Sequence, residues 1–158
     1  PKPLDIIYFL KTAISKAIDR GHSIVESDDF NSALEIYSKH ALDSLKPELT
    51  TNLNYISFDD LIFEFYGRKE IIDRQTIVDI LLKLEIDNTK IDEVISALID
   101  LNFIGIETDN NEFEFIYNEL EKERIIRKAT SYREKTTGKS IKFRINAPFH
   151  KYLEINEV

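Results

Sequence analysis

The sequence predicts a mainly α-helical chain with a small antiparallel β-sheet. Through most of the first hundred residues, apolar side chains recur every three or four positions, which is the period of an amphipathic helix. Near residues 113–117 and 141–145, apolar and polar side chains alternate instead, which is typical of half-buried strands. The chain has 158 residues, of which 42% are hydrophobic and 32% charged, and this composition excludes collagen-like and disordered proteins.

The first predicted unit, residues 1–47, is a helical hairpin. Its first helix is expected to end at Gly21, because glycine is favoured just after a helix C-terminus. A second helix is expected to begin near Ser27, which can cap it, and to end before Pro47. The polar residues 48–56 predict a linker.

The remaining residues, 57–158, predict a winged helix-turn-helix-like domain with a basic C-terminal extension. Helical patterns occupy residues 58–66, 73–84 and 88–101, with the capping residues Ser57, Asp73 and Asn88 at their starts. Two segments rich in β-formers, 103–107 and 112–117, then flank a short polar turn and predict a β-hairpin. This order is typical of a winged helix-turn-helix, whose third helix usually enters a DNA groove.

Beyond the hairpin, the sequence predicts one more helix, one more strand and a terminal turn of helix. Residues 118–134 place apolar side chains on one face, as a helix does. Residues 141–145 alternate and are expected to form a strand that joins the hairpin. Pro148 suits the first turn of a short terminal helix.

The composition also limits the function. The absence of cysteine excludes a disulfide scaffold, a thiolate metal site and a cysteine nucleophile, and it fits a reducing compartment, so we expect a cytoplasmic protein. His22, His40 and His150 are far apart in sequence, which argues against a zinc site. No apolar run approaches the roughly 20 residues of a membrane helix. Because the chain begins Pro-Lys-Pro and contains no methionine, we interpret it as a fragment.

The charge is distributed unevenly around a net value of −8. Residues 51–118 carry fifteen acidic and five basic side chains, whereas residues 122–144 carry nine basic and two acidic ones. The latter segment is the candidate nucleic-acid surface, with Arg127, Lys128, Arg133, Lys139, Lys142 and Arg144 as the chosen contacts. The alternative is that these side chains solvate a surface or pair with the acidic segment. The predicted third helix has Lys90 as its only positive charge, which disfavours insertion into a DNA groove.

The residues Thr136-Thr137-Gly138-Lys139-Ser140 look like the end of a phosphate-binding P-loop. The first glycine of that motif would fall at Arg133, and the segment leads into a predicted strand where a P-loop leads into a helix. Serine and carboxylate residues elsewhere form no recognisable nucleophile or acid–base constellation. We therefore expect this chain to lack enzymatic activity and to hold no cofactor.

One segment carries a family resemblance. Residues 17–33, Ala-Ile-Asp-Arg-Gly-His-Ser-Ile-Val-Glu-Ser-Asp-Asp-Phe-Asn-Ser-Ala, resemble the helical lid of AAA+ and STAND-type P-loop ATPases. The segment is similar to the lid of archaeal origin-recognition initiators, and closer to bacterial P-loop ATPases in which the lid continues into a winged helix. The resemblance implies nucleotide-sensing roles for Lys2 and Arg20 in the parent ATPase, which would bind ATP and Mg²⁺. Here Lys2-Pro3-Leu4-Asp5 stands where those ATPases tend to have Arg-Pro-Arg-Asp, and lysine lacks the planar fork of arginine.

The resemblance implies a non-catalytic C-terminal module that couples the nucleotide state of an upstream P-loop ATPase domain to protein or DNA contacts. The alternative is a free-standing winged-helix DNA-binding regulator. The implied partners are the upstream domain and non-specific DNA, with self-association left open and no membrane. If Lys2 and Arg20 act only as sensors in the full-length ATPase, alanine at either position should leave the melting temperature of this chain nearly unchanged. The competing structural interpretation of Arg20 is a solvated charge at a helix C-terminus.

Overall fold

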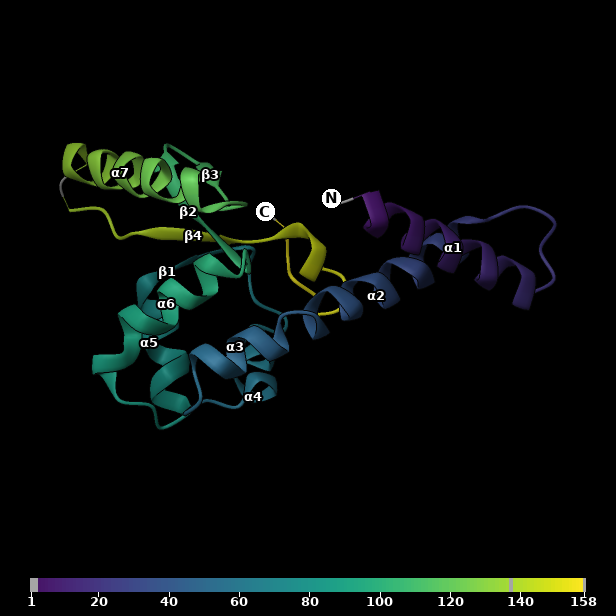
Figure 1. The fold of residues 1–158 in the computed structure, drawn as a ribbon, viewed down its shortest axis with the longest axis horizontal. Coiled ribbons are helices and arrows are strands. Elements are labelled where there is room, and N and C mark those ends of the chain that lie inside the picture. Colours follow the sequence, from purple (N-terminus) through teal and green to yellow (C-terminus); the bar gives the residue numbers. More distant parts are fainter. Residues whose placement is uncertain (1–2, 137, 158) are drawn as a thin grey trace.

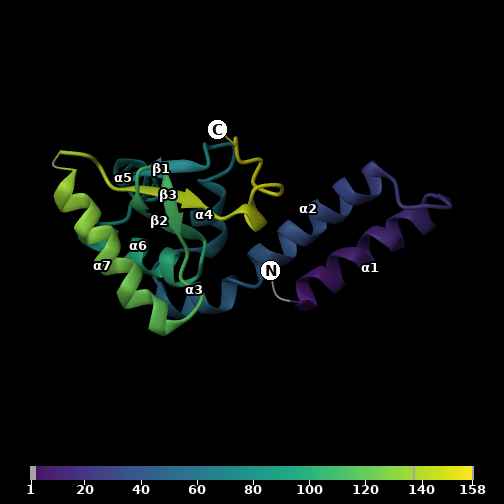
Figure 2. The same cartoon turned by 90° about the horizontal axis from the view of Figure 1, so that it is seen from above.

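The computed structural model describes residues 3–136 and 138–157 and confirms the predicted class (Figure 1). Helices predominate in this part of the chain, and four strands form one antiparallel sheet. Figures 1 and 2 show a helical hairpin that projects from a body containing the sheet and the other helices. Among the described residues, no helix combines the length and apolarity that crossing a membrane requires.

The projecting hairpin consists of α1 (Pro3–Asp19) and α2 (Ser27–Asp43), as the sequence predicts. The buried residues between the two helices include the small side chains of Ala13, Ala17 and Ala33. Small residues let the backbones of two helices approach closely. The large aliphatic side chains of α1 are largely exposed and do not fill this contact. Helix α2 begins at Ser27, with Glu26 in the N-cap position that we had expected Ser27 to fill.

Helix α3 (Lys46–Asn52) occupies much of the segment in which the sequence predicts a linker, residues 48–56. Pro47 lies in the first turn of α3, where its missing N–H costs nothing, so it starts this helix as well as following α2. The side chains of Leu49 and Leu53 are fully buried. The segment is therefore packed into the core, although the division of the chain into units at residues 47 and 57 stays a prediction.

The body continues with α4 (Phe58–Phe63), β1 (Ile71–Asp73), α5 (Arg74–Lys83), η1 (Asn88–Lys90) and α6 (Ile91–Asp100). Two predicted caps are confirmed: Ser57 Oγ accepts from the N–H of Asp60, and Asp73 Oδ1 accepts from the N–H of Thr76 at 2.8 Å. The third cap lies one residue earlier than predicted, because Asp87 Oδ1 accepts from the N–H of Thr89 and starts the 3₁₀ turn η1. Strand β1 was not predicted.

The sheet is completed by β2 (Ile104–Asp109), β3 (Glu112–Glu114) and β4 (Lys142–Ile145), in the order β1-β4-β2-β3. The predicted β2–β3 hairpin is confirmed, although β3 ends at Glu114 where the pattern predicts a strand to residue 117. Strand β4 joins the hairpin as predicted and also pairs with β1, so that it lies inside the sheet. Its alternation is confirmed, because Phe143 and Ile145 are buried and Lys142 and Arg144 are exposed.

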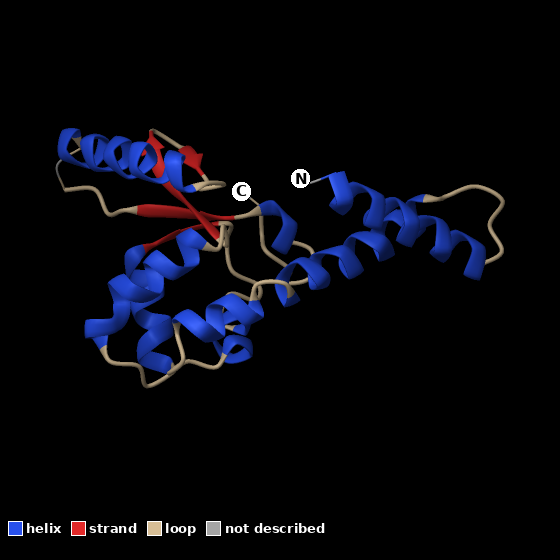
Figure 3. Cartoon of the chain, viewed as in Figure 1, coloured by secondary structure: helices blue, strands red, loops and turns tan. Residues whose placement is uncertain are grey.

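Helix α7 (Glu119–Lys135) connects β3 to β4 and packs on β2. In Figure 3, β4 runs between α7 on one side and α5 and α6 on the other. The predicted terminal helix is a single 3₁₀ turn, η2 (Ala147–Phe149), with Pro148 in it.

The core of the body is formed by buried side chains of the sheet and of helices α3 to α7. At its centre, the ring of Phe103 packs against Phe65 and Phe149, with centroid distances of 5.0 and 5.2 Å. The hairpin reaches this core through the end of α2, where the buried hydroxyl of Ser38 accepts a hydrogen bond from the backbone N–H of Tyr152 at 3.0 Å. The hairpin is thus anchored to the body through the second half of α2.

Candidate functional site

Helix α1 presents an apolar face that the rest of the described chain leaves exposed. We call it the α1 stripe, and its members are Ile6, Ile7, Leu10, Ile14 and Ile18. These side chains are between 46% and 69% exposed. With 100° between successive residues, they cover about a third of the helix circumference over about 18 Å, with no charged residue among them. A surface of this kind is typical of a site that another protein surface covers.

An apolar groove adjoins one end of the α1 stripe. It has a volume of about 510 Å³ and is lined by Asp5, Ile6, Phe9, Leu34, Tyr37, Tyr117, Asn146, Ala147 and Pro148. These residues come from both helices of the hairpin and from the segments around α7 and η2. Burial raises the pKa of Tyr37, with a smaller contribution from the nearby carboxylate of Asp5, so its hydroxyl stays protonated and available as a donor. The stripe on the hairpin thus continues into a groove that the hairpin and the body form together.

This surface was not identified from the sequence, because its side chains served there only as evidence of helical periodicity. A signal was present in the sequence: large apolar residues occupy Ile6, Ile7, Tyr8, Phe9 and Leu10 in succession. A helix that buries one face in its own domain needs an apolar stripe, and five successive apolar positions extend beyond such a stripe.

The tip of the hairpin is held together by a buried carboxylate. Asp29 is fully buried, and its Oδ1 accepts from Nη1 of Arg20 at 3.0 Å. Its Oδ2 accepts from the N–H of Glu26 at 2.9 Å and lies 2.8 Å from Nδ1 of His22. Arg20 also donates to Oγ of Ser32 at 2.9 Å. We call this network the Asp29 clasp, and it ties the loop between α1 and α2 to the start of α2.

The Asp29 clasp shifts the pKa values of two of its members in opposite directions. The hydrogen bond from His22 holds the pKa of Asp29 below its usual value, with further lowering by Glu26 and Arg20. The same hydrogen bond raises the pKa of His22. The clasp therefore favours a protonated imidazole beside an ionised carboxylate.

This geometry bears on the predicted nucleotide sensors. Arg20 is a partner of a buried carboxylate, so the interpretation of Arg20 as a merely solvated charge is wrong. The sequence did not indicate this pairing, because Asp29 comes nine residues later and lies beside Arg20 only when the hairpin has formed. Lys2 lies outside the described residues. A sensing role for either residue stays a prediction.

The predicted nucleic-acid contacts fall into two sets. Three of them pair with carboxylates: Arg127 with Glu123, Lys128 with Glu114, and Arg144 with Glu70, the last at 2.9 Å. Two neighbouring cations do the same, since Lys122 lies 2.7 Å from Asp100 and Arg124 lies 3.0 Å from Glu114. The other three predicted contacts, Arg133, Lys139 and Lys142, form no ion pair within residues 3–136 and 138–157. Pairing with acidic residues therefore accounts for part of the basic segment, and nucleic-acid binding by the remaining cations stays a prediction.

Helix α6 has an acidic exposed face. Most of its apolar residues are buried, and its exposed residues are Asp92, Glu93, Ser96 and Asp100. Lys90, just before the helix, is itself paired with Glu93 at 3.0 Å. A phosphate-lined groove would repel this face, as the sequence predicts.

The apparent P-loop remnant lies in a turn between α7 and β4. Gly138, Lys139 and Ser140 follow the end of α7, and β4 begins at Lys142; Thr137 lies outside the described residues. A P-loop needs a helix N-terminus after its Lys and Ser to receive the phosphates, and here a strand follows.

We therefore expect this chain to show no measurable affinity for Mg-ATP or Mg-GTP and no hydrolysis of either. Calorimetric titration of the chain with each magnesium nucleotide checks this expectation. The control is Lys139→Ala, which should give the same flat titration. Tight binding that the substitution abolishes would contradict our interpretation of the turn.

The histidines have structural partners. His150 is buried, with Nε2 2.7 Å from the carbonyl oxygen of Ile145 and Nδ1 3.1 Å from Oε1 of Glu157. His40 stacks on Tyr8 with ring centroids 4.7 Å apart, and His22 belongs to the Asp29 clasp. Within the described part of the chain, no three His, Asp or Glu side chains gather closely enough to hold a metal ion.

Comparison with known proteins gives one finding, which falls on the hairpin. Residues 1–46 match a family model described as a FunZ-associated C-terminal helical domain. No curated protein and no solved structure matches the chain. The region that carries the α1 stripe and the Asp29 clasp is therefore similar to a helical domain that occurs together with FunZ, which fits an accessory module of a larger protein.

Proposed function

We propose that this chain is a non-catalytic interaction module, and that its hairpin docks through the α1 stripe on a FunZ-type domain of the same protein. The observation that carries the proposal is the position of the α1 stripe. It lies within residues 1–46, the segment similar to a FunZ-associated C-terminal helical domain. The description "C-terminal" indicates that other chain precedes this domain in the proteins that carry it, and this preceding domain is the occupant that we assign to the stripe.

The energetics support a protein occupant. Completely burying a fully exposed aliphatic side chain of this size contributes about 1.5–3 kcal/mol. The five side chains of the stripe are 46% to 69% exposed, so a partner that covers them gains roughly half of that amount for each. The face has no charged residue to favour water over an apolar partner. The body of the chain contacts the hairpin through α2, where Ser38 accepts from Tyr152, and leaves the α1 stripe exposed.

We further propose that the FunZ-type domain is a P-loop ATPase that binds ATP and Mg²⁺, and that the hairpin is its lid. Support comes from the resemblance of residues 17–33 to such lids. Because Arg20 already pairs with Asp29, sensing of a nucleotide would require the Arg20 guanidinium to share or leave that carboxylate. In this proposal the whole assembly works in the cytoplasm.

The test of docking is a charge placed on the stripe. The double substitution Ile7→Glu and Ile14→Glu should abolish binding of the chain to a separately produced FunZ-type domain, measured by calorimetry with ATP and with ADP. The control is Ser15→Glu, which adds one negative charge at an exposed position of α1 next to the stripe, and the single substitution Ile14→Glu is the stripe variant that matches it in charge. If the stripe variant binds as well as the control, the stripe is not the docking surface.

Two further results bear on the ATPase part of the proposal. The gene segment upstream of Pro1 should encode a Gly-x-x-x-x-Gly-Lys-Ser/Thr motif, and the affinity of the chain for the FunZ-type domain should differ between ATP and ADP. Docking with equal affinity in both nucleotide states would contradict coupling while leaving docking intact.

A second candidate function is a winged-helix DNA-binding regulator. The order α4, β1, α5, α6, β2, β4 favours it, since a winged helix has the same succession of helices and strands, with its first strand paired to its last. In that comparison β3 and α7 are an insertion between the two wing strands. The acidic exposed face of α6 argues against this function, because α6 would be the recognition helix.

A further inference from the structure

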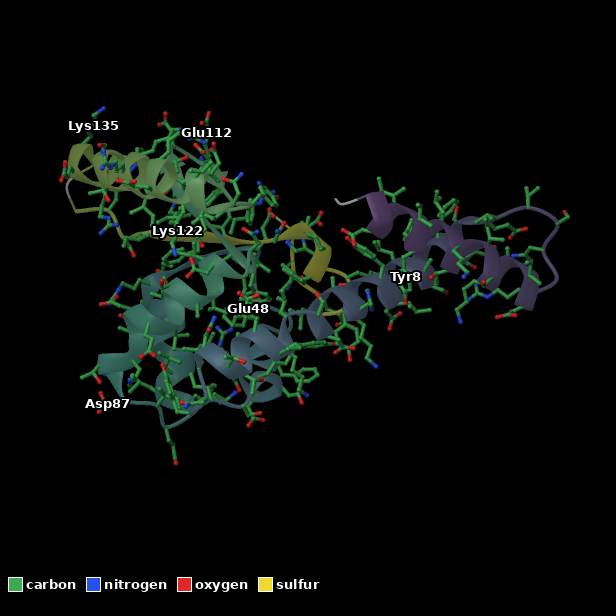
Figure 4. The ribbon with its side chains drawn as sticks, viewed as in Figure 1. Tyr8, Glu48, Asp87, Glu112, Lys122 and Lys135 are labelled. Carbon is green, nitrogen blue, oxygen red and sulfur yellow. The ribbon has the colours of Figure 1, made fainter. Side chains whose placement is uncertain are left out.

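We infer that the outer end of α7 and the start of β4 form a contact surface for the phosphodiester backbone of a nucleic-acid duplex. We call it the cationic end, and its members are Arg133, Lys135, Lys139 and Lys142. The inference is independent of hairpin docking, because the cationic end lies on other elements of the fold. Figure 4 shows Lys135 at the outer end of α7, on the side of the body away from the hairpin.

The first step of the inference is the partition of the basic segment by ion pairs. Toward its start, Lys122, Arg124, Arg127 and Lys128 are all neutralised by carboxylates of α6, β3 or α7 itself. Lys122, for example, lies on the side of α7 that faces α6, where it pairs with Asp100 (Figure 4). The four members of the cationic end form no such pair within residues 3–136 and 138–157. The positive charge available to an external partner is therefore confined to one end of the segment.

The second step is proximity. Arg133 and Lys139 line the same small hollow, together with Tyr132 and Ser140. Lys142 follows three residues after Lys139, at the first position of β4. It lies opposite Asp73 in the sheet register, but the carboxylate of Asp73 accepts from the backbone N–H and the hydroxyl of Thr76. This carboxylate is therefore engaged in capping α5.

The acidic groups near the cationic end do not cancel its charge. Glu134 is exposed between Arg133 and Lys135 and leaves a net charge of about +3 over residues 133–142. Glu107 also lines the hollow, but it is 8% exposed, and its Oε1 accepts from the N–H of Asn111 at 3.3 Å. The exposed side chains are thus mainly cationic.

The third step identifies the partner. Protein interfaces have an apolar or aromatic centre, whereas the exposed residues among the described positions 133–136 and 138–142 are Arg133, Glu134, Lys135, Gly138, Lys139, Ser140 and Lys142. Single-stranded nucleic acids are bound by stacking on exposed aromatic rings, and the nearest ring, Tyr132, is half-buried. A set of flexible cations without aromatic or apolar anchors fits the regularly spaced phosphates of a duplex, in contacts that do not depend on base sequence.

The test compares the cationic end with the paired cations of the same segment. Fluorescence anisotropy of the full chain with a 20-base-pair DNA duplex of arbitrary sequence should show binding at 20 mM salt. With four phosphate contacts, log K should fall with log salt at a slope of about −3.6, a loss of about 300-fold between 20 and 100 mM. The double variant Arg133→Gln and Lys139→Gln should flatten this slope by about 1.8.

The matched control is Arg127→Gln with Lys128→Gln, which removes two charges from the same helix and should leave the slope unchanged. The melting temperatures of the variants are measured in parallel. If they are equal, a change in the slope reports the loss of phosphate contacts and not unfolding. Repeating the titration with an RNA duplex of the same length distinguishes DNA from RNA as the source of the phosphodiester backbone. Equal affinity for both identifies a general duplex contact, and higher affinity for the DNA duplex identifies DNA as the ligand.

Several outcomes would overturn the inference. Absence of duplex binding at 20 mM salt is one, and an equal loss of binding in the control variant is another. Tighter binding of poly-glutamate than of either duplex would assign the surface to an acidic protein. Sequence-specific binding abolished by Lys90→Ala would show that α6 enters the groove after all.

Discussion

Replacing Phe103 with alanine is expected to destabilise the chain by about 3–5 kcal/mol, as large-to-small substitutions of buried aromatic residues do. Phe103 is fully buried, and its ring contacts both Phe65 and Phe149, so alanine would leave a cavity between three elements of the core. Because small domains are stable by only about 5–15 kcal/mol, a loss of this size brings the chain close to unfolding at room temperature.

Urea denaturation followed by circular dichroism measures this effect. The control is Phe63→Ala, since Phe63 is 53% exposed and its removal should change the free energy of unfolding by less than about 1 kcal/mol. Equal effects of the two substitutions would show that Phe103 is not central to the core.

Replacing Asp29 with alanine is expected to lower the melting temperature by about 5 °C or more, because the Asp29 clasp would lose its acceptor. Arg20, His22 and the N–H of Glu26 all donate to or contact this one carboxylate. Arg20→Ala should cost less, because His22 and Glu26 remain as partners of Asp29. Scanning calorimetry of the two variants checks this order. An unchanged melting temperature in Asp29→Ala would contradict the clasp.

The same network predicts a pH dependence with a definite sign. The raised pKa of His22 means that its contribution to stability is complete below its usual pKa of about 6.5 and is lost as the pH rises through the folded-state value. The lowered pKa of Asp29 means that its contribution is present above its usual value and is lost as the pH falls through the folded-state value. The melting temperature should therefore fall as the pH rises from about 6.5 through the raised pKa of His22, and His22→Gln should remove part of that fall.

Most helices of this fold could be predicted from the sequence, because each carries its own period and its own cap. Asp73 illustrates this, since its side chain caps α5 by accepting from the N–H of Thr76, three residues later. Strand β1 could not be predicted in this way. It has three residues, and its pairing depends on β4, which comes much later in the chain. Helix α3 was missed for a different reason: Pro47 fits both the end of one helix and the first turn of the next.

The candidate surfaces were predicted less well, because they depend on which residues find partners. The sequence identifies the basic segment, but only the fold shows that Glu70 lies beside Arg144 and Glu114 beside Lys128. Likewise, periodicity identifies Leu10 and Ile14 as apolar helix positions, yet it does not say whether another element of the chain covers them.

The position of β4 has a consequence for how the chain is made. Strands β1 and β2 do not pair with each other, and β4 lies between them and pairs with both. During synthesis, both strands leave the ribosome long before their common neighbour, and contacts this distant in sequence form slowly. Until residues 142–145 emerge, each of these strands has an edge with unpaired N–H and C=O groups, which is where chains tend to aggregate. A translation product that stops before Lys142 would keep both edges exposed, so the sheet depends on a segment made near the end of this sequence.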